Sequence, residues 1–275
     1  MRTLAVLFLS LLLSSPLLAQ DGQPFPRDCT LPFEDIAMEH DLDQDCGIEG
    51  KTTSAANALQ NRAKNNFCAE GEPARVSRRS FERLQDASDE AGFTSGQPPE
   101  DRSGLQNLYT TSDGITIGEG SLVRFVAFII DAHHSNVKKG ESVNCKRGGR
   151  ENNDIHIVLA QSKSVSDFCT SITAEMSPHF RPEDWDSGVL EDLNRPVRLT
   201  GNLFFDGSHV PCRPGRRASP ARASVWEIHP VYQVDVCINT SLSGCPFDDD
   251  SKWVPLHEFQ TEEEIQHEAM EADEG

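Results

Sequence analysis

The sequence predicts a mainly β protein whose strands follow a small helical region, and three observations support this prediction. Several runs after residue 119 are rich in β-branched and aromatic residues, as strands are. Two earlier segments instead repeat apolar residues at helical spacing. Charge also changes there, because 9 basic and 18 acidic residues over 20–118 give −9, whereas 14 and 15 over 119–238 give −1. We therefore expect a helical and irregular region over 20–116 and a β domain over 117–238.

The first 19 residues are typical of an export signal. Arg2 supplies a positive start, Leu4 to Leu13 form an apolar stretch, and Ala19 ends a small-residue cleavage site. This stretch is too short to span a membrane, and no later one could; an uncleaved anchor is the alternative. We therefore expect an exported protein without a membrane span, periplasmic or extracellular.

Eight cysteines in an exported chain favour disulfides over metal thiolates. Three lie early (Cys29, Cys46, Cys68) and five lie later (Cys145, Cys169, Cys212, Cys237, Cys245). Both counts are odd, so if all eight pair, at least one bridge joins the two regions. The sequence leaves the pairing open.

Two helices are predicted before the strands. One covers Ser54–Phe67, where apolar residues recur at helical spacing. The second covers Ser77–Ala91, with Ser77 or Ser80 as its N-cap and Gly92 closing its end.

Five strands follow, and each is placed by an apolar run or by alternation. A connection that is helical or irregular is expected over 165–180, and a loop over Arg181–Asn194. The expected strands are Gly120–Asp131, Ser142–Lys146, Asn153–Ala160, Val197–Phe205 and Val225–Val236.

Five strands with a helical connection between the third and the fourth resemble an OB-fold, a five-stranded Greek-key barrel that binds oligonucleotides or oligosaccharides. The opening Glu119-Gly-Ser-Leu-Val-Arg-Phe-Val-Ala-Phe128 is similar to the long, bending first strand of that fold. A β-sandwich is the alternative. The Asp-x-His phrase at 154–156 and Trp226-Glu-Ile-His-Pro230 are also similar to phrases in uncharacterised exported bacterial proteins, a likeness that implies no activity.

Two of the expected strands carry an acid followed by a histidine. Side chains alternate across a strand, so Asp154 and His156 should face outward, as should Glu227 and His229, while Trp226 should pack inside. The resemblance to the OB-fold implies that the third and fifth strands are parallel neighbours. These four side chains would then share one patch.

Three interpretations of the patch remain open. It could bind a divalent metal, with ligand types suited to zinc or manganese. It could support acid–base or ligand-gripping chemistry, with each histidine oriented by a carboxylate. It could also be a cross-strand network that fixes the register of the sheet. Glu175 is either a cap on this patch or a solvated helix position.

Basic residues gather in the loops after the first and before the fifth expected strand. An OB-fold commonly builds its ligand cleft from these two loops, and arginine forks match phosphate and carboxylate. An ordinary exposed loop would also be polar and charged. The expected ligand-binding residues are Lys138, Lys139, Arg213, Arg216, Arg217 and Arg222.

The sequence therefore predicts a binding module for an anionic polymer, a glycan or a protein partner. The formal charge of −19 and the acidic segment 239–275 disfavour nucleic acid. The alternative is a metal-dependent hydrolase, of phosphodiesters for example, that uses Asp154, His156, Glu227 and His229. No hydrolase elbow, phosphate-binding loop or His-Glu-x-x-His helix occurs in the chain.

Overall fold

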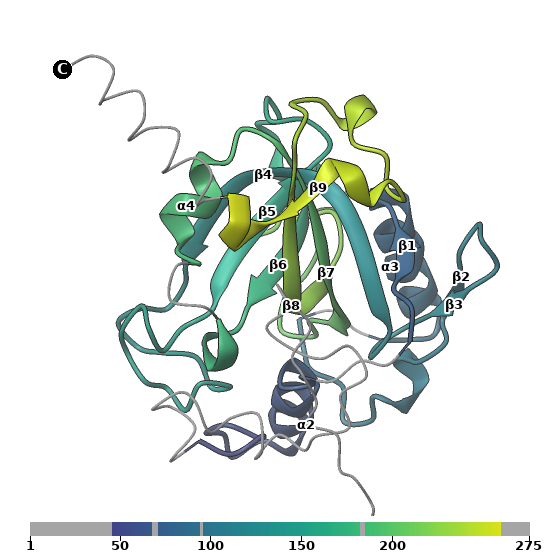
Figure 1. The fold of residues 1–275 in the computed structure, drawn as a ribbon. Coiled ribbons are helices and arrows are strands. Elements are labelled where there is room, and N and C mark those ends of the chain that lie inside the picture. Colours follow the sequence, from purple (N-terminus) through teal and green to yellow (C-terminus); the bar gives the residue numbers. More distant parts are fainter. Residues whose placement is uncertain (1–45, 68–70, 94–95, 182–184, 260–275) are drawn as a thin grey trace, which may run out of the picture.

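The computed structural model describes residues 46–67, 71–93, 96–181 and 185–259, and its centre is a closed five-stranded barrel (Figure 1). The barrel order is β4-β5-β6-β8-β7, and pairing of β4 with β7 closes it. β6 and β8 run parallel, whereas the other neighbours are antiparallel. This mainly β, OB-like barrel confirms the predicted fold class. The barrel strands are β4 (Leu122–His134), β5 (Ile155–Ala160), β6 (Ile172–Met176), β7 (Pro196–Phe205) and β8 (Trp226–Cys237).

The first barrel strand, β4, pairs with two neighbouring strands along its length. Its first half pairs with β7 from Leu122 to Phe128, and its second half pairs with β5 from Phe128 to His134. A register shift between Ile129 and Asp131 marks an irregularity in the pairing with β5. The predicted strand at this position is confirmed, and it continues to His134.

The strand predicted over Ser142–Lys146 is wrong, because this segment is a series of turns. Cys145 and Lys146 have φ angles of 53° and 58°, in the left-handed region that strands exclude. Cys145 is also held by a disulfide to Cys46. The strand predicted as the third, over Asn153–Ala160, is therefore the second strand of the barrel, β5.

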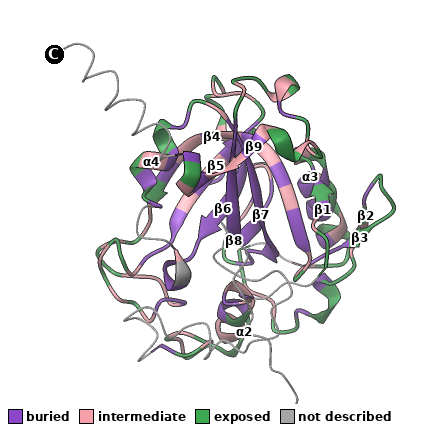
Figure 2. Cartoon of the chain, in the orientation of Figure 1, coloured by how far each residue is buried: buried purple, intermediate pink, exposed green. Residues whose placement is uncertain are grey.

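The true third strand, β6, occupies a segment for which a helix or irregular chain was predicted. All five of its residues, Ile172 to Met176, are buried (Figure 2). Its sequence, Ile-Thr-Ala-Glu-Met, does alternate apolar and polar residues, but it is short and its Ala, Glu and Met favour helices, which explains the wrong prediction. Because β6 lies between β5 and β8, the expected contact between the Asn153–Ala160 and Val225–Val236 strands does not form.

The helical connection between the third and fourth barrel strands is α4 (Ser187–Asp192), in a segment predicted as loop. Asp186 caps this helix by accepting a hydrogen bond from the Gly188 amide at 2.8 Å. The connection is helical, as the resemblance to the OB-fold implies, but it lies later in the chain than expected.

Both predicted N-terminal helices are present. α2 (Ala55–Lys64) has Ser54 as its N-cap, and α3 (Arg78–Glu90) has Ser77. Ser77 and Ser80 form a reciprocal capping box, and Gly92 follows α3 with a φ of +86°. The predicted caps of α3 are therefore confirmed.

Smaller elements surround the barrel. β1 (Ala74–Val76) adds to β4 in parallel, β2 (Tyr109–Thr110) pairs with β3 (Thr116–Ile117), and β9 (Trp253–Pro255) pairs with β8. β9 belongs to the segment expected to begin the acidic tail, whereas 260–275 lie outside the described residues, as do 1–45 with the predicted export signal. Single 3-10 turns cover Ser103–Leu105, Phe168–Thr170, Pro178–Phe180, Leu242–Gly244 and Asp250–Lys252.

Apolar side chains from alternate positions of the strands fill the barrel. Ile155, Ile157 and Leu159 of β5 belong to this core, as predicted. Trp226 is fully buried in the same core and packs edge-on against Phe205, which confirms its inward orientation. Among the helices of the described ranges, none combines the length and apolar character that a membrane crossing requires.

Three disulfides are formed by the described cysteines: Cys46–Cys145, Cys169–Cys212 and Cys237–Cys245. The first joins the N-terminal region to the barrel, as the odd cysteine counts predicted. Cys29 and Cys68 lie outside the described residues.

Candidate functional site

A polar cavity of about 830 Å³ lies on the outside of the barrel, over β4, β5 and β6. Its walls come from the β4–β5 connection, from the β7–β8 connection and from α2. OB-folds bind their ligands on the face of the second and third strands, between the corresponding loops. The cavity therefore occupies the position where this architecture binds ligands.

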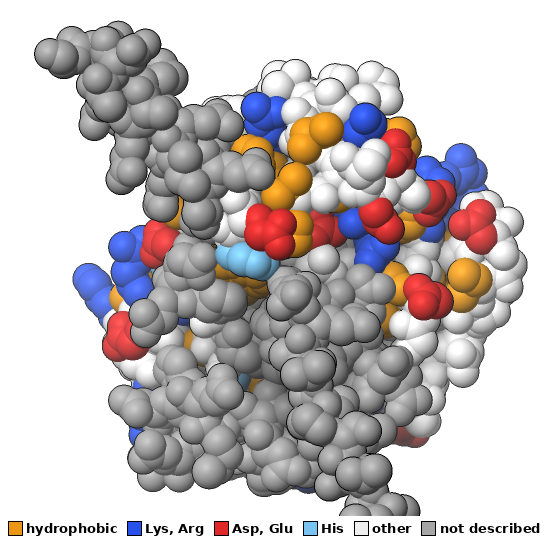
Figure 3. All heavy atoms as spheres, in the orientation of Figure 1, with side chains coloured by type: hydrophobic (Ala, Val, Ile, Leu, Met, Phe, Trp, Pro, Cys, Tyr) orange, Lys and Arg blue, Asp and Glu red, His pale blue; other side chains and the backbone are white. Residues whose placement is uncertain are grey.

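The predicted basic residues do not all lie in the cavity. Lys139, Arg217 and Arg222 line the cavity, whereas Arg213 and Arg216 line a smaller pocket beside Asp89, and Lys138 lines neither. On the face seen in Figure 3, the acidic and basic side chains of the described residues are interspersed and form no broad basic patch. Three of the six predicted basic residues thus line the cavity.

Arg222 is fully buried and lines the inner wall of the cavity. Its guanidinium pairs with the carboxylates of Glu227 and Asp206, and Asp206 also pairs with His209. Burial alone would raise the pKa of Asp206, but the hydrogen bond and charge of His209 and the charge of Arg222 lower it to about 2. Glu227 therefore contacts Arg222 and is not part of the predicted shared patch.

His156 lies in the cavity between two carboxylates. Its Nε2 atom is 3.3 Å from Glu141 Oε1 and 2.8 Å from Ser135 Oγ, and its Nδ1 atom is 3.2 Å from Glu175 Oε1. Burial alone would lower the pKa of His156, but Glu175 and Glu141 raise it to about 9. His133 stacks on His156, with 5.8 Å between the ring centres. The imidazole of His156 is thus held in its charged form.

Glu175 of β6 joins the cavity to the polar residues beneath its floor. Its Oε2 atom is 2.8 Å from Lys64 Nζ and 2.7 Å from His229 Nδ1, while its Oε1 atom faces His156. Burial alone would raise the pKa of Glu175, but His156, Lys64 and His229 hold it well below its usual range. Of the two interpretations of Glu175, the structure supports the one that places it on the patch.

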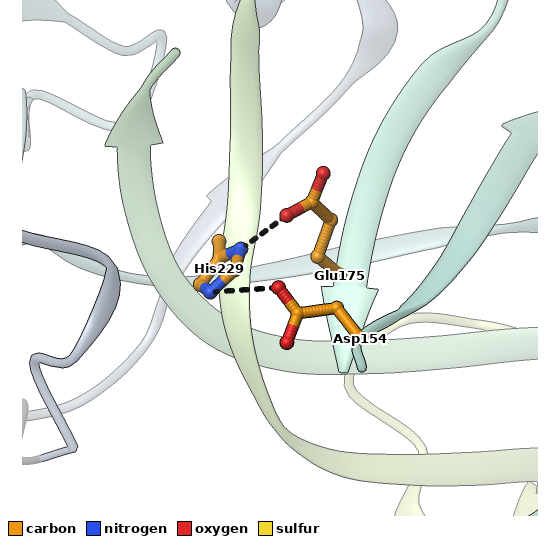
Figure 4. Close-up of side chains that lie close together, drawn as sticks. All are labelled: Asp154, Glu175 and His229. Atoms are coloured by element: carbon orange, nitrogen blue, oxygen red, sulfur yellow. Dashed lines mark hydrogen bonds and ion pairs between the residues drawn. The ribbon is translucent and has the colours of Figure 1, made fainter. Parts of the chain in front are cut away.

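Asp154 lies beneath the cavity floor, immediately before β5. Its Oδ1 atom accepts a hydrogen bond from Asn144 at 3.1 Å, and its Oδ2 atom is 3.9 Å from His229 Nε2 (Figure 4). Oδ2 is buried and has no hydrogen-bond partner among the described residues. Burial and the charge of Glu141 raise the pKa of Asp154 to about 8.

Local packing of β7 against β8 keeps His229 in place. A Cβ atom on Gly201 would lie 2.4 Å from Pro230 O, so the close approach of β7 to β8 requires glycine at this position. Phe204 of β7 contacts the His229 ring, with 5.6 Å between the ring centres. The same phenyl ring lies 5.7 Å from Lys64 Nζ. The apolar ring of Phe204 thus packs against both His229 and Lys64.

The sequence identified part of this arrangement. Asp154, His156 and His229 do come together, but through Glu175 rather than by direct pairing of their strands. Lys64 and the Asp206–His209 pair were missed. Lys64 ends a helix with no pattern that distinguishes it from a solvated lysine, and Asp206 and His209 occupy a loop, where no periodicity orients side chains.

No protein-family profile, curated protein or solved structure matches this chain. The class of protein is therefore defined by topology and site: a closed, OB-like barrel with a polar cavity on the ligand-binding face of that architecture.

Proposed function

We propose that this protein is a binding module that holds an anionic group, a phosphate or a carboxylate, in the cavity over β4, β5 and β6. The observation that carries the proposal is that both connecting loops line one cavity and that each brings a cation to it, Lys139 and Arg217. This chain has a formal charge of −19, so the placement of one cation from each loop on the ligand-binding face is informative.

The charges of the cavity support an anionic ligand. Its four carboxylates already have partners, because Asp131 pairs with His133, Glu141 with His156, Glu175 with Lys64, and Asp206 with Arg222. Lys139, in contrast, forms no ion pair with any residue in the described part of the chain. An incoming anion would therefore meet cations whose charge is not fully compensated.

Arg217 is also accessible to a ligand. It pairs with Asp167 at 3.1 Å, but both side chains are 61% exposed. Exposed ion pairs contribute little stability, ~0–1 kcal/mol, so a ligand that offers a better-placed anion can replace Asp167. Lys139 and Arg217 are thus the two cations that we assign to ligand capture.

The compartment belongs to the same proposal. Three disulfides among the described residues fit a protein that folds under oxidising conditions, as the leader-like residues 1–19 predict. We propose that the protein is exported and that its ligand is an anionic glycan of the cell envelope or its surroundings.

The test compares binding to polygalacturonate, to a phosphate-containing glycan and to neutral dextran at several salt concentrations. Reversal of two charges, Lys139→Glu with Arg217→Glu, should weaken anion binding at least about tenfold and reduce its salt dependence. The matched control is Arg79→Glu with Arg83→Glu, which makes the same charge change on exposed positions of α3 outside the cavity.

Binding of one anionic glycan but not of dextran, lost in the cavity variant alone, is the expected result. Equal losses in the cavity and control variants would overturn the proposal, as would the absence of saturable binding to either anionic glycan.

A metal-dependent hydrolase is the second candidate function. The observation that favours it is the juxtaposition of Asp154, Glu175 and His229 under the cavity floor. A bound divalent ion could lower the pKa of a water molecule, as such ions do in hydrolases. The hypothesis requires metal binding, which can be tested by itself.

A further inference from the structure

Three buried side chains meet beneath the floor of the cavity. Asp154 precedes β5, Glu175 belongs to β6 and His229 to β8, and each is only 1% exposed. One potential ligand atom from each lies within 4.8 Å of the other two, and Figure 4 shows both carboxyl groups turned toward the imidazole. The sheet order β5-β6-β8 brings them together.

One atom of this group lacks a bonding partner. Asp154 Oδ2 is buried and has no hydrogen-bond partner among the described residues. A buried carboxylate oxygen without a donor or a cation is energetically costly. His229 Nε2 lies 3.9 Å from this atom, which is too far for a hydrogen bond.

The distance between Asp154 Oδ2 and His229 Nε2 is close to the distance between two atoms that bind the same metal ion. Zinc lies about 2.0–2.2 Å from carboxylate oxygen and imidazole nitrogen. A separation of 3.9 Å would need to shorten by roughly 0.5 Å to place both atoms on one tetrahedral ion. Side-chain rotation can supply a movement of this size.

The histidine already has the support that metal-bound histidines receive. Glu175 Oε2 lies 2.7 Å from His229 Nδ1, which directs the opposite nitrogen, Nε2, toward Asp154. A carboxylate on the second ring nitrogen is the usual outer partner of a metal-ligating histidine.

Charge balance in this part of the molecule also favours a cation. Five carboxylates surround the site, whereas three side chains there carry a fixed positive charge and His156 is also held charged, so one negative charge remains when all five carboxylates are ionised. Lys64 bonds to Glu175, and Arg181 bonds to backbone carbonyls, so neither satisfies Asp154 Oδ2. The carboxylates are Glu141, Asp154, Glu175, Asp206 and Glu227, and the cations are Lys64, Arg181 and Arg222.

We propose that Asp154 and His229, with Glu175 as the outer partner of His229, form a binding site for one divalent transition-metal ion, zinc or manganese. Mixed nitrogen and oxygen donors suit these ions, whereas magnesium and calcium prefer oxygen alone. This inference does not depend on the capture of anions by Lys139 and Arg217.

The test is calorimetric titration of the full, EDTA-treated chain with Zn²⁺ and with Mn²⁺, with Mg²⁺ for comparison. One Zn²⁺ or Mn²⁺ ion should bind per chain and raise the melting temperature. Asp154→Asn, which retains the acceptor for Asn144, should weaken binding at least about tenfold. His229→Gln should have a similar effect, and the cobalt-loaded wild type should show a visible absorption spectrum that both variants lose.

The matched control is the pair His257 and Glu258, whose Nε2 and Oε1 atoms are also 3.9 Å apart but whose side chains are exposed. Substitution of both by Gln should leave metal binding unchanged. The absence of saturable Zn²⁺ or Mn²⁺ binding by the wild type would overturn the inference. Binding that depends on His257 and Glu258 but not on Asp154 would overturn it as well. Anion binding measured in EDTA keeps the two proposals separable.

Discussion

Lys64 and Glu175, which are 111 residues apart in the sequence, form an ion pair of 2.8 Å between α2 and β6 in which the carboxylate is buried and the lysine largely so. The ammonium group provides the floor of the cavity with its fixed positive charge. Burial alone would lower the pKa of Lys64, but Glu175 and other carboxylates raise it well above its usual value, so the lysine stays charged. One contact thus connects the N-terminal helix to the central strand of the site.

Replacement of this lysine by an apolar residue of similar length should destabilise the protein strongly. Lys64→Met would leave Glu175 with less compensation inside the structure. Breaking one side of a buried pair typically costs about 3–5 kcal/mol. Urea unfolding measures the loss, with Lys51→Met at an exposed position as the control. A loss equal to that of the control would show that His156 and His229 alone stabilise the Glu175 carboxylate.

Acid should remove the stability contributed by Asp206. Its folded-state pKa, about 2, lies below the value of 3.8 expected without the fold. A lowered carboxyl pKa contributes stability that is present above pH 3.8 and is lost as the pH falls through about 2, and the difference corresponds to about 2 kcal/mol. The gap in unfolding free energy between wild type and Asp206→Asn should therefore shrink from pH 5 to pH 2. A gap that is constant over this window would contradict the assignment.

The Cys46–Cys145 bridge should contribute more stability than the Cys237–Cys245 bridge. The first closes a separation of 99 residues and the second a separation of 8. Chain entropy predicts about 4.7 kcal/mol for the long loop and about 2.5 kcal/mol for the short one. Paired Cys→Ala variants, compared by denaturant unfolding, test this order. A greater loss in the Cys237–Cys245 variant would show that local packing outweighs loop closure.

Loss of the N-cap should weaken α3 without disturbing the cavity. Ser77→Ala removes the hydroxyl that accepts the Ser80 amide at 3.3 Å, and N-cap loss typically costs about 1 kcal/mol. Thermal unfolding should show the decrease, while anion binding should not change, because α3 does not line the cavity. Ser112→Ala in an exposed turn is the control, and a cavity defect in the α3 variant would contradict this separation.

The outcome of the sequence predictions depends on the residue types of each strand as well as on their alternation. In β5, alternation identified Ile155 and Ile157 as core, and it placed His156 on the outer face together with Asp154, which immediately precedes the strand. β6 does alternate, as Ile-Thr-Ala-Glu-Met, but it is short, and its Ala, Glu and Met are typical of helices. Glu175 could therefore not be recognised as the centre of the site.

Loop contacts were beyond prediction for a different reason. Arg222 is buried because Asp206 and Glu227 neutralise it, yet in the sequence it resembles its exposed neighbours Arg216 and Arg217. Which arginine turns inward depends on partners that only the folded chain supplies. Composition could locate basic loops but could not assign individual roles within them.

The positions of the site residues in the sequence determine the stage of folding at which the site can form. Its members run from Lys64 in the first described helix to His229 in the last barrel strand. A chain that emerges from its N-terminus cannot assemble the site until β8 has paired with β6 and β7. Every partly synthesised or partly folded molecule therefore lacks it. A metal ion bound at the site would thus distinguish completely folded molecules from incompletely folded ones.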